Sequence, residues 1–163
     1  MDAIEAIRKR RAVRKYLDKE VSRELLETIV DCGRLAATAR NEQPWEFIVI
    51  IDKELKKSVA DQTDNGRFIS EAGACIAVVC KDTKYYIEDG SAATQNMLVA
   101  AAALGLGSCW VAGDKKPYCS SILELLNVPS SYRLVSLVAI GYAESIPSPH
   151  KRSLNDVLHW NSF

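Results

Sequence analysis

The longest stretch of the sequence without a charged residue runs from Gly90 to Gly113. A stretch of this length can cross a lipid bilayer, so whether it is a membrane helix or part of a buried core decides what the chain can fold into. The adjacent amides Gln95 and Asn96 lie inside it, and Gly105 and Gly107 interrupt it where a helix would end. We therefore expect no membrane span, but a buried helix that ends at the glycines and is followed by a strand.

The predicted helix extends from about Ile87 to Leu106, and its second half, Met97–Leu104, is apolar on every side. A helix of this kind is expected to be central and largely buried in the folded protein. The core of one small domain cannot bury the apolar surface of this helix on every side. We therefore predict a homodimer in which residues 89–106 form much of the interface.

The rest of the chain alternates amphipathic segments with short apolar runs rich in β-branched residues. Asp2 followed by Glu5 is typical of a helix N-terminus, and a second helix is expected to begin at Ser22. The further expected elements are helices over residues 22–37, 53–62 and 118–126, and strands over residues 45–51, 75–80, 108–112 and 134–142. No linker or internal repeat divides them, so this order predicts an α+β fold in a single domain, residues 1–163.

The charges and cysteines argue against several classes of protein. The 21 Lys and Arg residues balance 21 Asp and Glu residues, so the overall field does not favour nucleic acid or an anionic membrane as a partner. The five cysteines include no C-x-x-C pair and both histidines lie near the end, so we expect no metal site and no disulfide framework. The N-terminus lacks the features of a signal peptide, and we expect a cytoplasmic protein.

No motif in the chain supplies catalytic chemistry by itself, because the sequence lacks nucleophile-elbow, zinc-protease and P-loop patterns. The segment Gly105-Leu106-Gly107 resembles the start of a dinucleotide-binding fingerprint. However, Trp110 stands where the third glycine is needed, and the glycines follow a helix instead of a strand. We therefore favour the hypothesis that a bound cofactor supplies the chemistry and that it binds at another segment of the chain.

Two basic segments could bind the phosphate of such a cofactor. In Arg8–Lys15, six of eight residues are basic, and Arg10 and Arg14 can converge on phosphate oxygens where the first helix ends. The second segment is His150-Lys151-Arg152, in a loop near the C-terminus. For both segments, the alternative is an ordinary solvated basic surface.

Two further segments could bind a planar polar group. The loop Thr38–Trp45 offers amide and hydroxyl groups between a helix and a strand. The strand Ser108–Gly113 ends in small residues, whose backbone N–H groups can approach a ligand closely. The alternatives are plain turn chemistry for the loop and an ordinary buried strand end for the second segment.

Taken in order along nearly the whole chain, these segments resemble the FMN-dependent nitroreductase family. The family opens with an Arg-Arg-Ser-x-Arg-like segment and carries an Asn-x-Gln-Pro-Trp loop. It then has a long helix with Asp-x-x-x-x-x-Gln-Asn that ends in Gly-Leu-Gly, and it closes with Gly-Tyr, Pro and Lys-x-Arg. The matching segments here are Arg10–Arg14, Asn41–Trp45, Asp89–Gly107 and Gly141–Arg152. The resemblance implies a nitroreductase-like α+β fold, with a central, mostly antiparallel sheet of four to five strands flanked by helices, in a dimer.

By matching position, the resemblance also implies which residues bind FMN. Arg10, Arg11 and Arg14 would contact the phosphate, the ribityl chain or the pyrimidine edge, and Arg14 would support the negative charge of reduced flavin near N1. The other implied contacts are Thr38, Asn41 and Gln43 from the loop, across the dimer interface; Val111, Ala112 and Gly113 packed on the ring, with a backbone N–H aimed at flavin N5; and Arg152 on the phosphate.

Three departures from the family pattern are visible. Ala12 stands in the FMN-binding segment where the family often has serine, so one hydroxyl to the phosphate is lost. His150 occupies the place of the usual lysine, and Lys151 beside it can substitute as a phosphate ligand. The chain also passes from Cys80 to Asp89 without the additional helices that cover the substrate pocket in larger members.

The activity that the resemblance implies is a ping-pong oxidoreductase reaction. NAD(P)H reduces FMN, and an electron-poor acceptor such as a nitroaromatic or a quinone oxidises it again, without a catalytic side chain or a metal. One alternative is an FMN-binding or storage protein without turnover. Another is a flavin enzyme of the same fold with different chemistry, such as dehalogenation or flavin fragmentation. The short Cys80–Asp89 connection predicts an open pocket that selects acceptors by shape.

Overall fold

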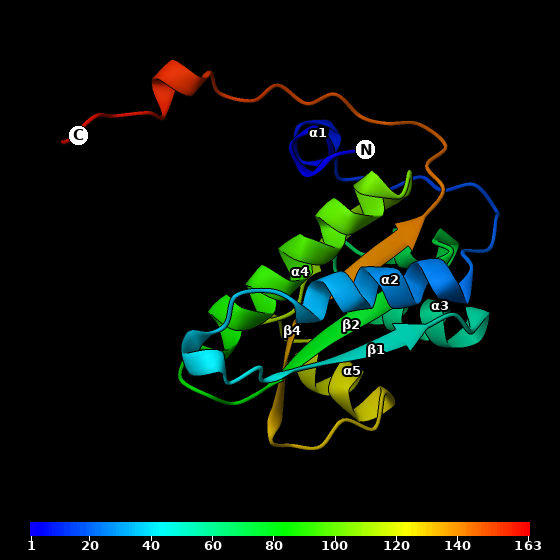
Figure 1. Cartoon of the computed structure of the whole chain (residues 1–163). Helices are drawn as coiled ribbons and strands as arrows, with labels where there is room; N and C mark the ends of the chain where they lie inside the picture. The colour runs from blue at the N-terminus through cyan, green and yellow to red at the C-terminus, as the bar shows by residue number, and fades with distance from the viewer.

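The apolar runs of the sequence form the four strands β1 (Trp45–Ile50), β2 (Ala74–Lys81), β3 (Gly107–Ala112) and β4 (Tyr132–Gly141). A computed structural model describes all residues, 1–163, and it places these strands in one antiparallel sheet with the order β1-β2-β4-β3 (Figure 1). The predicted α+β fold with a four-stranded antiparallel sheet is confirmed. β1 and β3 are the two edge strands.

Local sequence signals set the beginnings of the helices. The side chains of Asp2, Ser22 and Asp52 each accept a hydrogen bond from the backbone three residues on, which caps the first three helices. The helices are α1 (Ala3–Lys9), α2 (Arg23–Arg34), α3 (Lys53–Gln62), α4 (Tyr86–Ala103) and α5 (Cys119–Leu125), with 3₁₀ turns η1 (Ala39–Asn41), η2 (Arg67–Glu71) and η3 (Leu154–Asp156).

Two helices end at earlier residues than the sequence predicted. The second helix stops at Arg34 instead of residue 37, because the Ala36 N–H bonds to the Gly33 carbonyl and tightens the last turn. The long helix stops at Ala103 instead of Leu106, because Gly105 takes a left-handed backbone conformation with φ of 78°. The three 3₁₀ turns were not predicted.

The sheet is covered on both faces, and each face has its own apolar core. The helices α2 and α4 cover one face, where Met97, Leu98 and Ala101 of α4 are buried against the sheet. The helices α3 and α5 cover the other face, with Ile122 and Val59 in the core. The central helix α4 is largely buried in the protomer, as expected, and Leu104, just past its end, is 37% exposed.

The chain leaves the body of the protein after β4 and ends in a C-terminal tail, residues 145–163. Every residue of this tail is exposed, and no hydrogen bond ties it to the rest of the protomer. The tail runs past α1 and away from the sheet (Figure 1). Its exposed large apolar residues are Ile146, Leu154, Val157, Leu158, Trp160 and Phe163. None of the helices combines the length and apolarity that crossing a membrane requires.

Candidate functional site

Two of the predicted segments meet at the free edge of β3. Ala12 forms a parallel bridge with Ser108, and the Val13 N–H donates to the Ser108 carbonyl at 2.9 Å. The segment Arg10–Arg14 is therefore attached to the edge of β3 by a single bridge and runs parallel to it there. It lies on the same edge as Val111, Ala112 and Gly113, and this edge is the centre of the candidate site.

The direction of the bridge sets the order of the arginines along this edge. Because the two segments are parallel, Arg10 lies toward the beginning of β3 and Arg14 farther along it. Burial raises the pKa of the Cys109 thiol, while the positive charges of nearby Arg14 and Arg10 act in the opposite direction. Neither guanidinium makes a hydrogen bond or an ion pair, and that of Arg14 lies 5.9 Å from the centre of the Phe68 ring. The edge thus carries two cations that are free to bind an anion.

Arg11 is placed differently from its two neighbours. Its Nη1 atom donates to the Arg8 and Arg10 carbonyls at 2.7 and 2.8 Å, and these carbonyls lie at the end of α1. A guanidinium in this position satisfies carbonyls that lack partners at a helix C-terminus. Its contact with FMN stays a prediction, and the geometry gives Arg11 a structural role as well.

The hydrogen-bond pattern of β3 shows which backbone amides are free. Along an antiparallel strand, the N–H and C=O of one residue point to the same side, and the sides alternate. The Ser108 carbonyl points to the free edge, whereas the Gly113 N–H points inward and donates to the Val135 carbonyl at 3.2 Å. The amides of Trp110 and Ala112 therefore point to the free edge. Ala112 is exposed, and its own carbonyl accepts a hydrogen bond from the Tyr118 hydroxyl.

The loop that contains Thr38, Asn41 and Gln43 is held by a buried carboxylate. Asp89, in the first turn of α4, is 4% exposed, and its Oδ1 and Oδ2 atoms accept from the Ala39 N–H at 2.9 Å and the Thr38 hydroxyl at 2.8 Å. The Thr38 Oγ1 atom accepts in turn from the Gln43 N–H at 3.1 Å. The Thr38 hydroxyl is thus used to build the loop, whereas the side chains of Asn41 and Gln43 are exposed.

Three residues of this loop have left-handed backbone conformations, with φ of 53° at Arg40, 57° at Asn41 and 48° at Gln43. Such conformations cost free energy in residues other than glycine, and they persist only where the surrounding structure holds them. Sequence reasoning missed the anchoring role of Asp89. The signal that could have found it is an acidic residue at the point where the chain enters its charge-free stretch.

Replacing Asp89 by alanine is expected to destabilise the fold by about 2–4 kcal/mol, because it leaves the half-buried Thr38 hydroxyl and Ala39 N–H without their carboxylate partner. Urea unfolding of the two proteins measures the difference. The matched control is Glu88→Ala, which removes the same charge from an exposed neighbour in the same helix turn. Equal unfolding free energies for both variants would contradict the anchoring role.

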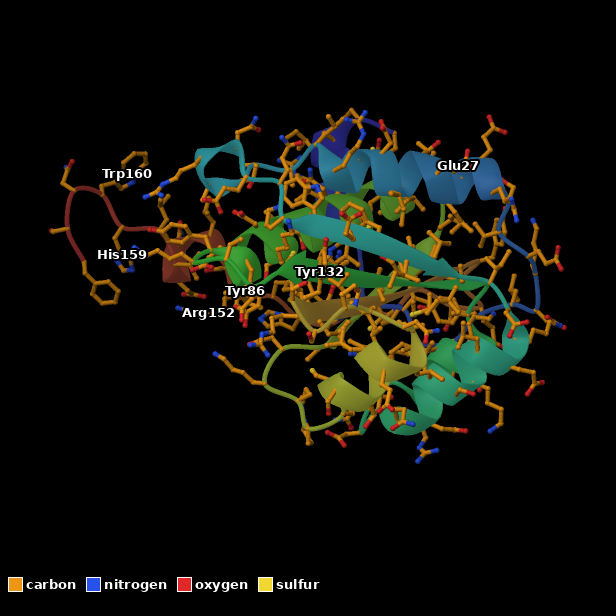
Figure 2. The ribbon with its side chains drawn as sticks, turned by 90° about the horizontal axis from the view of Figure 1, so that it is seen from below. Glu27, Tyr86, Tyr132, Arg152, His159 and Trp160 are labelled. Atoms are coloured by element: carbon orange, nitrogen blue, oxygen red, sulfur yellow. The ribbon has the colours of Figure 1, made fainter.

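The structure does not join the late basic segment to the rest of the site. Lys151 and Arg152 lie on the C-terminal tail, and the Arg152 guanidinium donates to the Asp156 carbonyl within that tail. Figure 2 shows Arg152, His159 and Trp160 along the tail, beyond the end of the sheet. The meeting of Arg152 with Arg10 on one phosphate therefore stays a prediction, and no contact within the protomer forms it.

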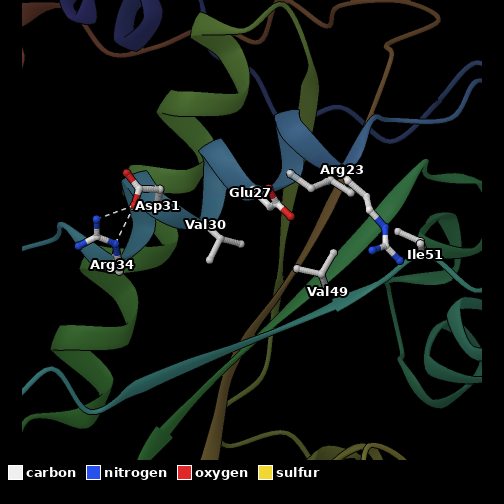
Figure 3. A pocket seen from close by; sticks show the side chains of 8 residues that line it. Arg23, Glu27, Val30, Asp31, Arg34, Val49 and Ile51 are labelled. Carbon is white, nitrogen blue, oxygen red and sulfur yellow. Dashed lines mark hydrogen bonds and ion pairs between the residues drawn. The ribbon is translucent and has the colours of Figure 1, made fainter.

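A groove of about 390 Å³ lies at the opposite edge of the sheet, between α2 and β1 (Figure 3). Val30 and Val49 form part of its apolar lining, and Asp31 and Arg34 make an ion pair of 2.6 Å at one end. The groove contains none of the predicted cofactor-binding residues. The edge of β3 remains the candidate site, although it is an open surface in the protomer.

A model of the nitroreductase family matches this chain over residues 7–75 and 69–142, which include the basic segment, the loop, α4 and β3. The chain belongs to the nitroreductase family. A relative from Archaeoglobus fulgidus, described as a "putative NADH dehydrogenase/NAD(P)H nitroreductase", is 37% identical over 149 residues, covering 86% of this chain and 85% of the relative.

Solved structures of the nitroreductase family agree with the fold. An FMN-dependent nitroreductase from Clostridium difficile is 31% identical with a TM-score of 0.92, and the match covers 98% of this chain and 99% of that one. A "putative nitroreductase in complex with fmn" from Desulfovibrio desulfuricans is 29% identical with a TM-score of 0.88, covering 100% and 98% of the two chains. The predicted family and fold are thereby confirmed for this chain.

Proposed function

We propose that this protein is an FMN-dependent oxidoreductase that uses NAD(P)H to reduce an electron-poor acceptor. The observation that carries the proposal is the order of groups along one sheet edge: the Arg10 guanidinium, the Arg14 guanidinium and the free Ala112 N–H. β3 is about 17 Å long, so this edge offers two cations and a donor to an elongated anionic ligand. Relatives described as NAD(P)H nitroreductases and an FMN-dependent nitroreductase support the assignment.

Each group along the edge suits one part of FMN. Arg10 would bind the phosphate, and Arg14 would lie beside the ring near N1, where its charge stabilises the reduced form. The Ala112 N–H would donate to the ring at N5, while Val111 and Gly113 would pack against it. FMN, when bound, supplies the hydride chemistry in both half-reactions. The protein orients the ring, and no side-chain acid or base is required.

A homodimer would complete the site. One protomer leaves exposed the apolar side chains of the tail, of Ile4 and Ile7 on α1, and of Leu104 at the end of α4. Monomeric proteins rarely expose so many apolar side chains together. In the dimer, the loop with Asn41 and Gln43 would approach FMN from the partner, and the tail would bring Lys151 and Arg152 to the phosphate.

The test is anaerobic mixing of the purified protein, loaded with FMN, with NADH and with NADPH. Bleaching of the flavin absorbance, followed by its return when a nitroaromatic or a quinone is added, supports the enzyme. A protein that binds FMN but stays oxidised would instead be a binding or storage protein. Reduction without transfer to either acceptor class would point to different flavin chemistry on the same fold.

We also expect reduced FMN to react with oxygen in this protein. The connection between β2 and α4 consists only of residues 82–85, so no inserted helix from this connection covers the edge of β3. An open site admits oxygen and lets uncharged acceptors stack on the ring, and their rates should follow electron affinity. Oxygen consumption with NAD(P)H alone and a series of acceptors of graded potential test this. No oxygen uptake, or strong selectivity among neutral acceptors of equal potential, would contradict it.

The expected location is the cytoplasm. All five cysteines are free thiols in the structure, and Cys75, Cys80 and Cys109 are buried. Free thiols are usual in a reducing compartment. We therefore propose a cytoplasmic location for this protein.

A further inference from the structure

A tyrosine and an aspartate form a hydrogen-bonded pair just beyond the end of β3. The Tyr86 hydroxyl, at the start of α4, donates to Oδ1 of Asp114 at 2.6 Å. Asp114 is the second residue after Ala112, so the two Cα atoms are at most about 7 Å apart. The Asp114 and Gly113 amides both reach the Val135 carbonyl, at 3.4 and 3.2 Å, which holds this turn against β4.

The Asp114 carboxylate lies on the side of the sheet that α4 covers. Ala112 is paired with Ser136 across the sheet, and the Ser136 hydroxyl is 2.7 Å from that of Thr94 on α4. Residues directly opposite in neighbouring strands present their side chains on the same face. The exposed Ala112 side chain therefore faces the α4 side, and the bond from Tyr86 holds the Asp114 carboxylate on that side too.

The Asp114 carboxylate lies near the Arg133 guanidinium, whose pKa it helps to raise, but Arg133 is itself paired with Asp82. The neighbouring carboxylates are paired, Asp82 with Arg133 at 2.7 Å and Asp64 with Lys116 at 3.7 Å, whereas Asp114 makes no ion pair. Its hydrogen-bond partner is neutral. The bond to Asp114 is the main cause that raises the pKa of Tyr86 to about 12, and burial is the second, so the phenol stays protonated at neutral pH.

We propose that Asp114, held by Tyr86, makes this site discriminate against anionic electron acceptors. The inference rests on the proposed function, in which the acceptor stacks on the flavin ring next to Ala112. A negative charge on an acceptor that stacks there is repelled by the carboxylate even in water, and the repulsion grows as the site loses water. The expected penalty is about three- to tenfold in kcat/KM. The substrate class is therefore an uncharged or cationic aromatic acceptor.

The test compares two acceptors of similar shape and different charge, 4-nitrobenzamide and 4-nitrobenzoate, in the FMN-loaded protein. The quantity measured is the ratio of kcat/KM for the amide to kcat/KM for the carboxylate. In the Asp114→Asn variant, this ratio should fall about three- to tenfold, because the carboxylate substrate gains while the amide changes little. The asparagine keeps an oxygen that accepts the Tyr86 hydrogen bond, so the turn should be preserved.

Two controls separate a local charge from other effects. Asp31→Asn changes the net charge equally, but it lies on α2 beside the opposite edge strand and should leave the ratio unchanged. Tyr86→Phe removes the hydrogen bond but retains the carboxylate, so discrimination against the anionic acceptor should persist. Added salt should narrow the ratio of the unmodified protein and have less effect on Asp114→Asn.

The possible failures are distinguishable. A protein that binds no FMN, or that never turns over either acceptor, contradicts the proposed function. Turnover of the amide, with a ratio that is the same in the unmodified protein, Asp114→Asn and Asp31→Asn, leaves that function standing and overturns the role of Asp114. An equal change of the ratio in both asparagine variants also overturns it, because the effect would then come from net charge.

Discussion

Replacing Arg10 by alanine is expected to weaken FMN binding about tenfold to hundredfold. A charge-assisted hydrogen bond between a guanidinium and a phosphate contributes about 1.5–3 kcal/mol, which corresponds to this range of affinity. Arg10 makes no hydrogen bond or ion pair that would be lost in the free protein, so the fold should be little affected. Titration of the apoprotein with FMN, followed by flavin fluorescence, measures the change.

The same loss is expected for Arg152→Ala if the tail of one protomer reaches the phosphate bound by the other. The matched control is Arg8→Ala, which lies two residues before Arg10 and is exposed on α1. Arg10→Lys should fall between alanine and arginine, because an ammonium keeps the charge but loses the paired donors. Unchanged FMN affinity in both Arg10→Ala and Arg152→Ala would contradict the assignment of the phosphate site.

Much of the fold could be predicted because its signals are local. The capping side chains of Asp2, Ser22 and Asp52 are read within one helix turn, and the apolar runs of β2 and β4 are continuous. The helix ends were less predictable. Whether α4 continues past Ala103 depends on the backbone conformation of Gly105. Glycine adopts both positive and negative φ angles, so the sequence alone does not fix this conformation.

The candidate site was predictable in its residue types, but less so in its geometry. The free cations Arg10 and Arg14 follow from composition and resemblance, whereas the turning of Arg11 back onto α1 depends on how the helix ends. Which amide of residues 111–113 is free depends on the register of β3 with β4, a contact between distant segments. The pairing of Tyr86 with Asp114 is equally non-local, and it qualifies the expectation of selection by shape alone.

The loop shows the same limit more clearly. The segment Thr38–Gln43 was predicted as a group of ligand donors, and its residue types fit that role. The structure uses the Thr38 hydroxyl for the loop itself, because Asp89 lies 51 residues further along the chain and packs beneath it. A sequence pattern can identify polar groups in a loop. The pattern does not show which of these polar groups form hydrogen bonds within the protein that hold the strained loop conformation.

Deleting the C-terminal tail, residues 145–163, is expected to convert the protein from a dimer to a monomer at micromolar concentration. The tail has no hydrogen bond to its own protomer and exposes Trp160 to 80%, together with five other large apolar side chains. Burying one such side chain in a partner contributes about 1.5–3 kcal/mol, so Trp160→Ala alone should weaken dimerisation about tenfold to hundredfold. Sedimentation equilibrium over a range of concentrations measures both variants.

The control for the tail is Leu35→Ala, an exposed apolar residue just beyond α2, which should leave the dimer intact. If the tail carries Lys151 and Arg152 to the partner, its deletion must lower both the FMN affinity and the fraction of dimer. The two quantities should then change over the same range of protein concentration. A shortened protein that remains a dimer would mean that α1 and α4 form the interface without the tail. An unmodified protein that sediments as a monomer with FMN bound would contradict the dimer itself, since the site would then be complete in one protomer.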